Sequence, residues 1–148
     1  MTIEVDQSIK IEQSGATVLA YANGQTAAIL IPQRVKRAGL ATLLAKGKSR
    51  EIATLLLFAA GLYLLLKEDL ITAQKIVIDR EYEGQDHNIK SFLVEYSKKA
   101  DQNIKPERID FAYVGKQSPA DKKARGVRTG KDKTYRKISL VELLRVIA

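Results

Sequence analysis

The sequence contains no cysteine and a single histidine, His87. The absence of cysteine excludes disulfides, thiolate zinc sites and a cysteine nucleophile. One histidine is too few for a multi-histidine metal site. Any metal would therefore be held by oxygen ligands, which favour magnesium, manganese or calcium.

A long hydrophobic run is also missing. The most apolar stretch is ATLLLFAAGLYLLL at 53–66, which is shorter than the roughly 20 residues of a membrane-spanning helix and follows the charged segment 48–51. The N-terminal residues MTIEVDQSIK show no basic start before an apolar run, so they do not resemble a signal peptide. We therefore expect a helix buried in a protein core, no membrane partner and a cytoplasmic location.

Positive charge, in contrast, is in excess. The chain has 25 Lys and Arg against 17 Asp and Glu, a formal net charge of +8. Such a surplus favours polyanion partners, because neutralising phosphates releases counterions. Nucleic acid is the expected partner, and a lysine-rich solvated surface is the alternative. With 148 residues, the chain is long enough for one domain with one core, so we expect a single domain over 1–148.

The hydrophobic pattern predicts an alternation of strands and helices. Residues 8–31 read as three short strands, with turns at 13–15 and at Asn23-Gly24. The remaining expected elements are a helix-compatible segment at 33–45, a helix from its cap Ser49 to Lys67, strands at 72–79 and 108–114, and helices at 88–100, from Pro119 and at 138–148. Residues 126–137 are expected to form a mobile loop. The order β-β-β-α-β-α-β-α predicts an α/β fold with a mixed five-stranded sheet and helices on both faces.

Four acidic residues fall at expected strand ends or helix starts, where side chains can converge: Glu12, Glu51, Asp79 and Asp121. They lie in the segments IEQSG (11–15), SREIA (49–53), IDREY (78–82) and ADKKA (120–124). In their order and element types, these segments resemble the ribonuclease H family, type 1, over residues 8–127.

This resemblance implies a ribonuclease H-like fold and a metal-dependent nuclease that hydrolyses phosphodiester bonds, acting on the RNA of an RNA–DNA hybrid. Glu12, Glu51, Asp79 and Asp121 would be the catalytic residues and would hold two Mg²⁺ or Mn²⁺ ions. The chain departs from the family because its first acid is Glu12 instead of aspartate, and because residues 33–48 form an insertion. Glu81 and Glu83 alternate with Asp79, so one of them could supplement or replace Glu12.

Two basic segments flank these acids, and we expect them to contact phosphates. From Gly115 onward there are ten basic residues against three acids. The expected nucleic-acid contacts are Arg34, Lys36, Arg37, Lys48, Arg50, Lys116, Lys122, Lys123, Arg125 and Arg128.

Other functions fit the same sequence. A non-catalytic nucleic-acid-binding module or a structure-selective junction nuclease could share this fold, because hybrid nucleases and junction resolvases do so. A third hypothesis is a small adaptor whose acids are ordinary helix caps, with the basic segments as solvated loops. The sequence leaves the substrate and the oligomeric state open.

Overall fold

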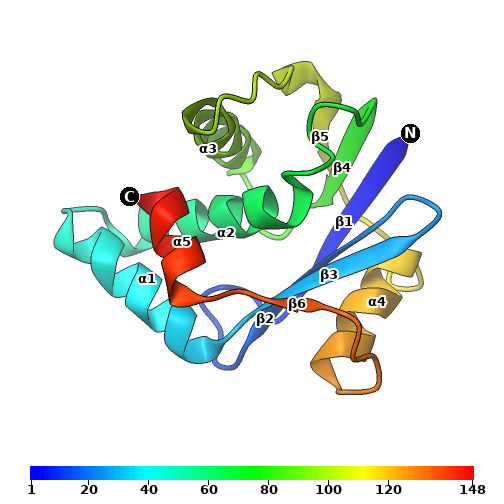
Figure 1. Ribbon diagram of the computed structural model, residues 1–148, viewed down its shortest axis with the longest axis horizontal. Helices are drawn as coiled ribbons and strands as arrows, with labels where there is room; N and C mark the ends of the chain where they lie inside the picture. Colours follow the sequence, from blue (N-terminus) through cyan, green and yellow to red (C-terminus); the bar gives the residue numbers. More distant parts are fainter.

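The computed structural model describes residues 1–148 and shows a mixed β-sheet flanked by helices (Figure 1). The strands are β1 (Thr2–Ser8), β2 (Thr17–Ala22), β3 (Thr26–Ile31), β4 (Lys75–Asp79), β5 (Ile109–Ala112) and β6 (Arg136–Lys137). The helices are α1 (Gln33–Ala45), α2 (Arg50–Leu66), α3 (Asp86–Lys99), α4 (Pro119–Arg128) and α5 (Leu140–Ile147), with a 3₁₀ turn at Pro106–Arg108.

The sheet has the strand order β5-β4-β1-β2-β3-β6. Strands β1, β2 and β3 form an antiparallel meander, whereas β4 is parallel to β1 and β5 is parallel to β4. The expected α/β class with a mixed sheet is confirmed. The expected number of five strands is wrong. Arg136 and Lys137, which were predicted to lie in a loop, pair with Ile29 and Leu30 and form a sixth, short strand.

Most of the hydrophobic core lies on one face of this sheet. Helix α2 packs there against β2 and β3, with α1, α3 and α5 around it. Gly61 brings α2 close to the sheet, since a Cβ at this position would lie 2.7 Å from Leu19 Cδ1. The apolar stretch at 53–66 is therefore the central core helix, as its composition predicts. No helix of the structure is long and apolar enough to cross a membrane.

A single helix, α4, covers the opposite face. Ala124 and Val127 of α4 pack against Val18, Ala20 and Ala28 of the meander. The small alanine side chains let the helix lie close to the strands. Helices thus cover both faces of the sheet, and α4 lies alone on the side opposite to α2 (Figure 1).

The position of the first strand differs from the prediction. In β1, Ile3 and Val5 are fully buried and alternate with polar residues, and the strand ends at Ser8. Ile9 then has a positive φ of 66°, which a β-strand does not tolerate. The predicted strand at 8–15 is therefore wrong. Glu12 lies on the turn after β1, and Gln13 N donates to Lys10 O within that turn.

Local signals elsewhere place the elements correctly. Helix α1 has its predicted bounds, and Ser49 caps α2 by accepting a hydrogen bond from Ile52 N at 3.2 Å. Pro119 is in the first turn of α4, and Ser118 caps that helix by accepting from Asp121 N at 3.1 Å. The predicted loop at 126–137 is partly wrong, because α4 continues to Arg128 and β6 follows.

Candidate metal site at the end of the parallel strands

Three carboxylates meet where β1 and β4 end: Asp6, Asp79 and Glu81. Val5 pairs with Ile78 in the parallel ladder, so the next residue on each strand, Asp6 and Asp79, stands at the same level. Glu81 follows Asp79 by two residues, the spacing that returns a side chain to the same face of an extended chain. One carboxylate oxygen from each of the three lies within 4.8 Å of the others.

Backbone groups hold two of these carboxylates in position. Asp79 Oδ1 accepts a hydrogen bond from Val114 N at 2.7 Å, which ties the end of β4 to the chain after β5. Asp6 Oδ1 accepts from Gln7 N at 2.8 Å. Asp6 is only 6% exposed. No Lys or Arg forms an ion pair with any of the three carboxylates.

Burial and mutual repulsion make this cluster reluctant to ionise. Burial, reinforced by the negative charge of Asp79, raises the pKa of Asp6 to about 7. Burial and the neighbouring Asp79 likewise raise the pKa of Glu81 to about 8. Carboxylates so close together need either shared protons or a cation to neutralise them. The donor set consists of hard oxygens, which suits Mg²⁺, Mn²⁺ or Ca²⁺.

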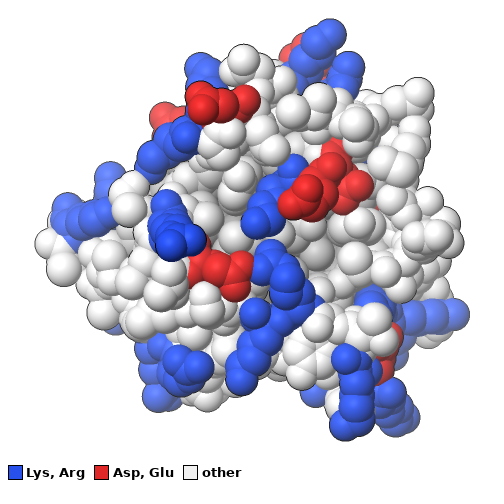
Figure 2. All heavy atoms as spheres, viewed as in Figure 1, with Lys and Arg blue, Asp and Glu red and all other residues white.

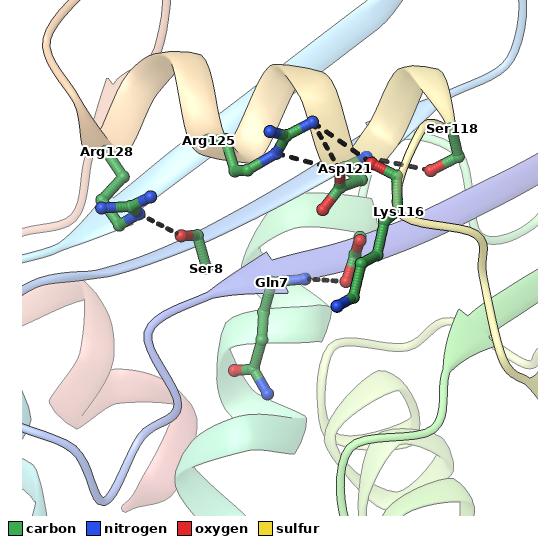
Figure 3. A network of polar contacts seen from close by, with 8 residues as sticks. Gln7, Ser8, Lys116, Ser118, Asp121, Arg125 and Arg128 are labelled. Carbon is green, nitrogen blue, oxygen red and sulfur yellow. Dashed lines mark hydrogen bonds and ion pairs between the residues drawn. The ribbon is translucent and has the colours of Figure 1, made fainter.

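Asp121 approaches the same cluster from α4. Its negative charge is a further cause of the raised pKa of Asp6, which places it beside β1. Arg125, one turn later, forms an ion pair of 2.9 Å with Asp121, and its guanidinium also donates to Lys116 O at 3.2 Å. Figure 3 shows Asp121 on the side of α4 that faces β1, with Ser118 capping the start of the helix. A predicted site residue thus lies at the border of the cluster, paired with an arginine.

The structure does not bring Glu12 and Glu51 into this cluster. Both are exposed, and they line a separate hollow of about 280 Å³ together with Glu83. Glu12 Oε1 accepts from Tyr82 Oη at 3.1 Å, and Glu51 Oε1 accepts from Gln85 Nε2 at 3.0 Å. Of the predicted acids, Asp79 is in the cluster and Asp121 is beside it. Of the two alternating glutamates, Glu81 joins Asp79 and Glu83 does not.

Asp6 is the member of the cluster that the sequence pattern did not predict. A signal for it exists, because Ile3 and Val5 alternate with Glu4 and Asp6 in the pattern of a half-buried strand. Asp6 lies inside that strand, two residues before its end at Ser8, whereas Asp79 ends β4. The predicted strand at 8–15 has Glu12 near its end, so the strand-end criterion selected Glu12 and not Asp6.

Two of the predicted nucleic-acid contacts are buried, and their charges are used inside the protein. Lys36 is 5% exposed, and its Nζ donates to Gln13 O at 2.9 Å and to Thr17 Oγ1 at 3.0 Å. Lys123 is 8% exposed, and its Nζ contacts Asp132 Oδ2 and Thr134 O, each at 2.8 Å. Both ammonium groups are thus engaged within the protein, which does not favour either lysine as a phosphate contact.

The other predicted basic residues remain on the surface. Arg128 extends from α4 and donates to Ser8 Oγ at 2.6 Å, while Lys116 points toward Gln7 at the end of β1 (Figure 3). Among the predicted contacts, the exposed side chains that form no ion pair and donate no hydrogen bond are Arg34, Arg37, Lys48, Arg50, Lys116 and Lys122. In the view of Figure 2, Lys and Arg gather at the lower right, over α4 and the loop that follows it.

Comparison with known proteins gives no match to a family model, a curated protein or a solved structure.

Proposed function

We propose that this protein is a metal-dependent nuclease whose metal site is formed by Asp6, Asp79 and Glu81. The observation that carries the proposal is the meeting of these three carboxylates at adjacent strand ends with no cationic side chain paired to them. When its carboxylates are ionised, such a cluster is destabilising without a bound cation.

The surrounding charges favour a phosphate-bearing substrate. Arg128 and Lys116 lie at the end of β1, and Lys122 extends from the exposed side of α4. Such side chains neutralise backbone phosphates and position a nucleic acid strand. A divalent ion bound by the carboxylates would supply Lewis-acid stabilisation of the phosphoryl oxygens and a more acidic water for attack. Asp121, released from Arg125, would be the fourth carboxylate available to this site.

The topology supports the ribonuclease H-like form of the proposal. The order β5-β4-β1-β2-β3 places one acid on β1, one on β4 and one in the first turn of α4, on neighbouring elements. Asp6, just beyond the last β1–β4 pair, takes the first-strand position expected of Glu12, and it is an aspartate, as is usual in that family. The proposed substrates are an RNA–DNA hybrid or a structured DNA or RNA.

A cleavage assay with matched variants tests the proposal. Labelled hybrid, duplex and branched substrates are incubated with Mg²⁺ or Mn²⁺ and with the wild type, Asp6→Asn, Asp79→Asn, Glu12→Gln or Glu51→Gln. We expect cleavage to be lost in Asp6→Asn and Asp79→Asn and to persist in the two glutamine variants. In calorimetric titrations, Asp6→Asn and Asp79→Asn should lose affinity for Mn²⁺, whereas the two glutamine variants should keep it.

Two results would count against the proposal. Equal Mn²⁺ affinity in the wild type and in Asp79→Asn would refute the proposed metal site. Metal binding with nucleic acid binding but without cleavage of any substrate would favour a non-catalytic module.

A further inference from the structure

A second hollow, of about 320 Å³, lies between the start of α1, the start of α2 and the turn after β1. Most of the residues around it are polar or charged, among them Gln13, Gln33, Arg37 and Arg50, while Ile11, Leu40 and Leu57 form its apolar part. It is distinct from the carboxylate cluster, since none of Asp6, Asp79 and Glu81 lines it. The proposed metal site therefore does not explain this hollow.

Two arginines face this hollow without any partner in the protein. Neither the Arg37 nor the Arg50 side chain forms an ion pair or donates a hydrogen bond, although most other arginines of the chain do. Two guanidinium groups that share a cavity repel each other, and an anion between them would remove that repulsion. Guanidinium groups also match the geometry of phosphate oxygens, which they bind through paired N–H groups.

The wall of the hollow adds to its positive character. Lys36 is a lining residue whose buried ammonium is held by oxygens of the turn, so its charge stays beside the cavity. Glu12 is the single acid of the lining, and it already accepts a hydrogen bond from Tyr82 Oη. Gln33, the first residue of α1, contributes to the lining, and the first turn of that helix contains no acid.

The same turn connects this hollow to the carboxylate cluster. Lys36 Nζ donates hydrogen bonds to Lys10 O at 3.4 Å and to Gln13 O at 2.9 Å. These two bonds hold both ends of the segment 10–13. The positive charge of Lys10 acts against the rise in the pKa of Glu81, so this end of the turn lies near the cluster. A nucleic acid strand held at a cation in the cluster would therefore be able to continue along the turn toward Arg37 and Arg50.

We propose that the hollow between α1 and α2 binds a backbone phosphate of the nucleic acid through Arg37 and Arg50. This inference rests on the proposed function for the identity of the substrate. It goes beyond that function by assigning a phosphate site, independent of metal, to the segment 33–50. That segment would then position the strand at a distance from the scissile bond.

Binding measured without metal tests this site separately from catalysis. The anisotropy of a labelled oligonucleotide is followed in a chelator for the wild type, for Arg37→Gln/Arg50→Gln and for a control, Lys98→Gln/Arg145→Gln. The control also removes two exposed, unpartnered charges, but outside this hollow. We expect about a tenfold or greater loss of affinity in the first variant and a slope of log Kd against log salt that is shallower by about 1. The control should keep the wild-type slope.

Inorganic phosphate serves as a direct probe of the hollow. It should weaken oligonucleotide binding by the wild type more than chloride of equal ionic strength does, and this difference should vanish in Arg37→Gln/Arg50→Gln. Equal losses of affinity in the two double variants would overturn the phosphate site, even if the protein cleaves nucleic acid. A selective loss in the arginine variant would uphold the site, even if no cleavage is found in any metal.

Discussion

Asp6 and Asp79 stand side by side on neighbouring parallel strands, one residue beyond the paired Val5 and Ile78. This register brings together two acids that are 73 positions apart in the chain, and Glu81 completes the group. Because no basic side chain neutralises them, the protonation and cation occupancy of this cluster must respond to solution conditions.

Without metal, the cluster should make the protein less stable as the pH rises. The pKa values of Asp6 and Glu81 are raised in the folded state to about 7 and about 8, so the folded protein holds protons that the unfolded chain releases. The stabilisation from these groups is complete below their unfolded pKa values and is lost as the pH rises through 7 and 8. In a chelator at pH 8, Asp6→Asn should be more stable than the wild type by at least about 1 kcal/mol, or ~2–4 °C in Tm.

Thermal unfolding at pH 5 and at pH 8 measures this effect. The gain from Asp6→Asn should shrink at pH 5, and Mn²⁺ at pH 8 should stabilise the wild type but not the variant. A wild type that is no less stable than Asp6→Asn at pH 8 would contradict the repulsion inferred for the cluster.

Arg125 should compete with a metal ion for Asp121, because its guanidinium pairs with that carboxylate at 2.9 Å. In Arg125→Gln the carboxylate is released, so the affinity for Mn²⁺ should rise by about twofold or more, the scale of an i,i+4 ion pair. Lys122→Gln is the matched control, since Lys122 is exposed on the same helix and has no partner. Titration calorimetry compares the two. Equal effects would mean that the change reflects net charge alone and not the release of Asp121.

Lys36 should stabilise the fold and not contact nucleic acid directly. Lys36→Met keeps the apolar stem but removes the ammonium that donates to Lys10 O, Gln13 O and Thr17 Oγ1. We expect a loss of about 1–3 kcal/mol in the free energy of unfolding, because buried acceptors lose their donor. Urea denaturation measures this loss. Arg34→Gln, on the exposed side of the same helix, should change stability by less than about 0.5 kcal/mol, and a similar loss in both variants would refute the distinction.

Ser118 should matter for the metal site as well as for stability. It caps α4 by accepting from Asp121 N, so Ser118→Ala should cost about 1 kcal/mol and loosen the turn that positions Asp121. Ser139→Ala removes the equivalent cap of α5, which lies away from the cluster, and should cost a similar amount. Chemical denaturation and Mn²⁺ titration of both variants separate the two effects. Only Ser118→Ala should bind Mn²⁺ more weakly, and an equal affinity in the two variants would show that α4 does not hold Asp121 for the site.

Much of the local structure follows from neighbouring residues and could be predicted from the sequence. Asn23-Gly24 supplies the hairpin turn, with Gly24 at a φ of 98°, and the caps Ser49 and Ser118 mark where α2 and α4 begin. These features depend on one hydrogen bond or one backbone angle within a few residues. The buried central helix also follows from the composition of 53–66.

The sequence by itself thus determined the α/β class, the starts of α1, α2 and α4, the basic surplus and two members of the cluster, Asp79 and its alternating neighbour Glu81. Only the tertiary structure decided which acids meet, because strand register joins residues that are far apart in the chain. It placed Asp6 and Glu81 beside Asp79 and placed Glu12 and Glu51 at a separate hollow. It also decided that the ammonium groups of Lys36 and Lys123 are satisfied inside the protein, since burial depends on packing between distant elements and not on residue type.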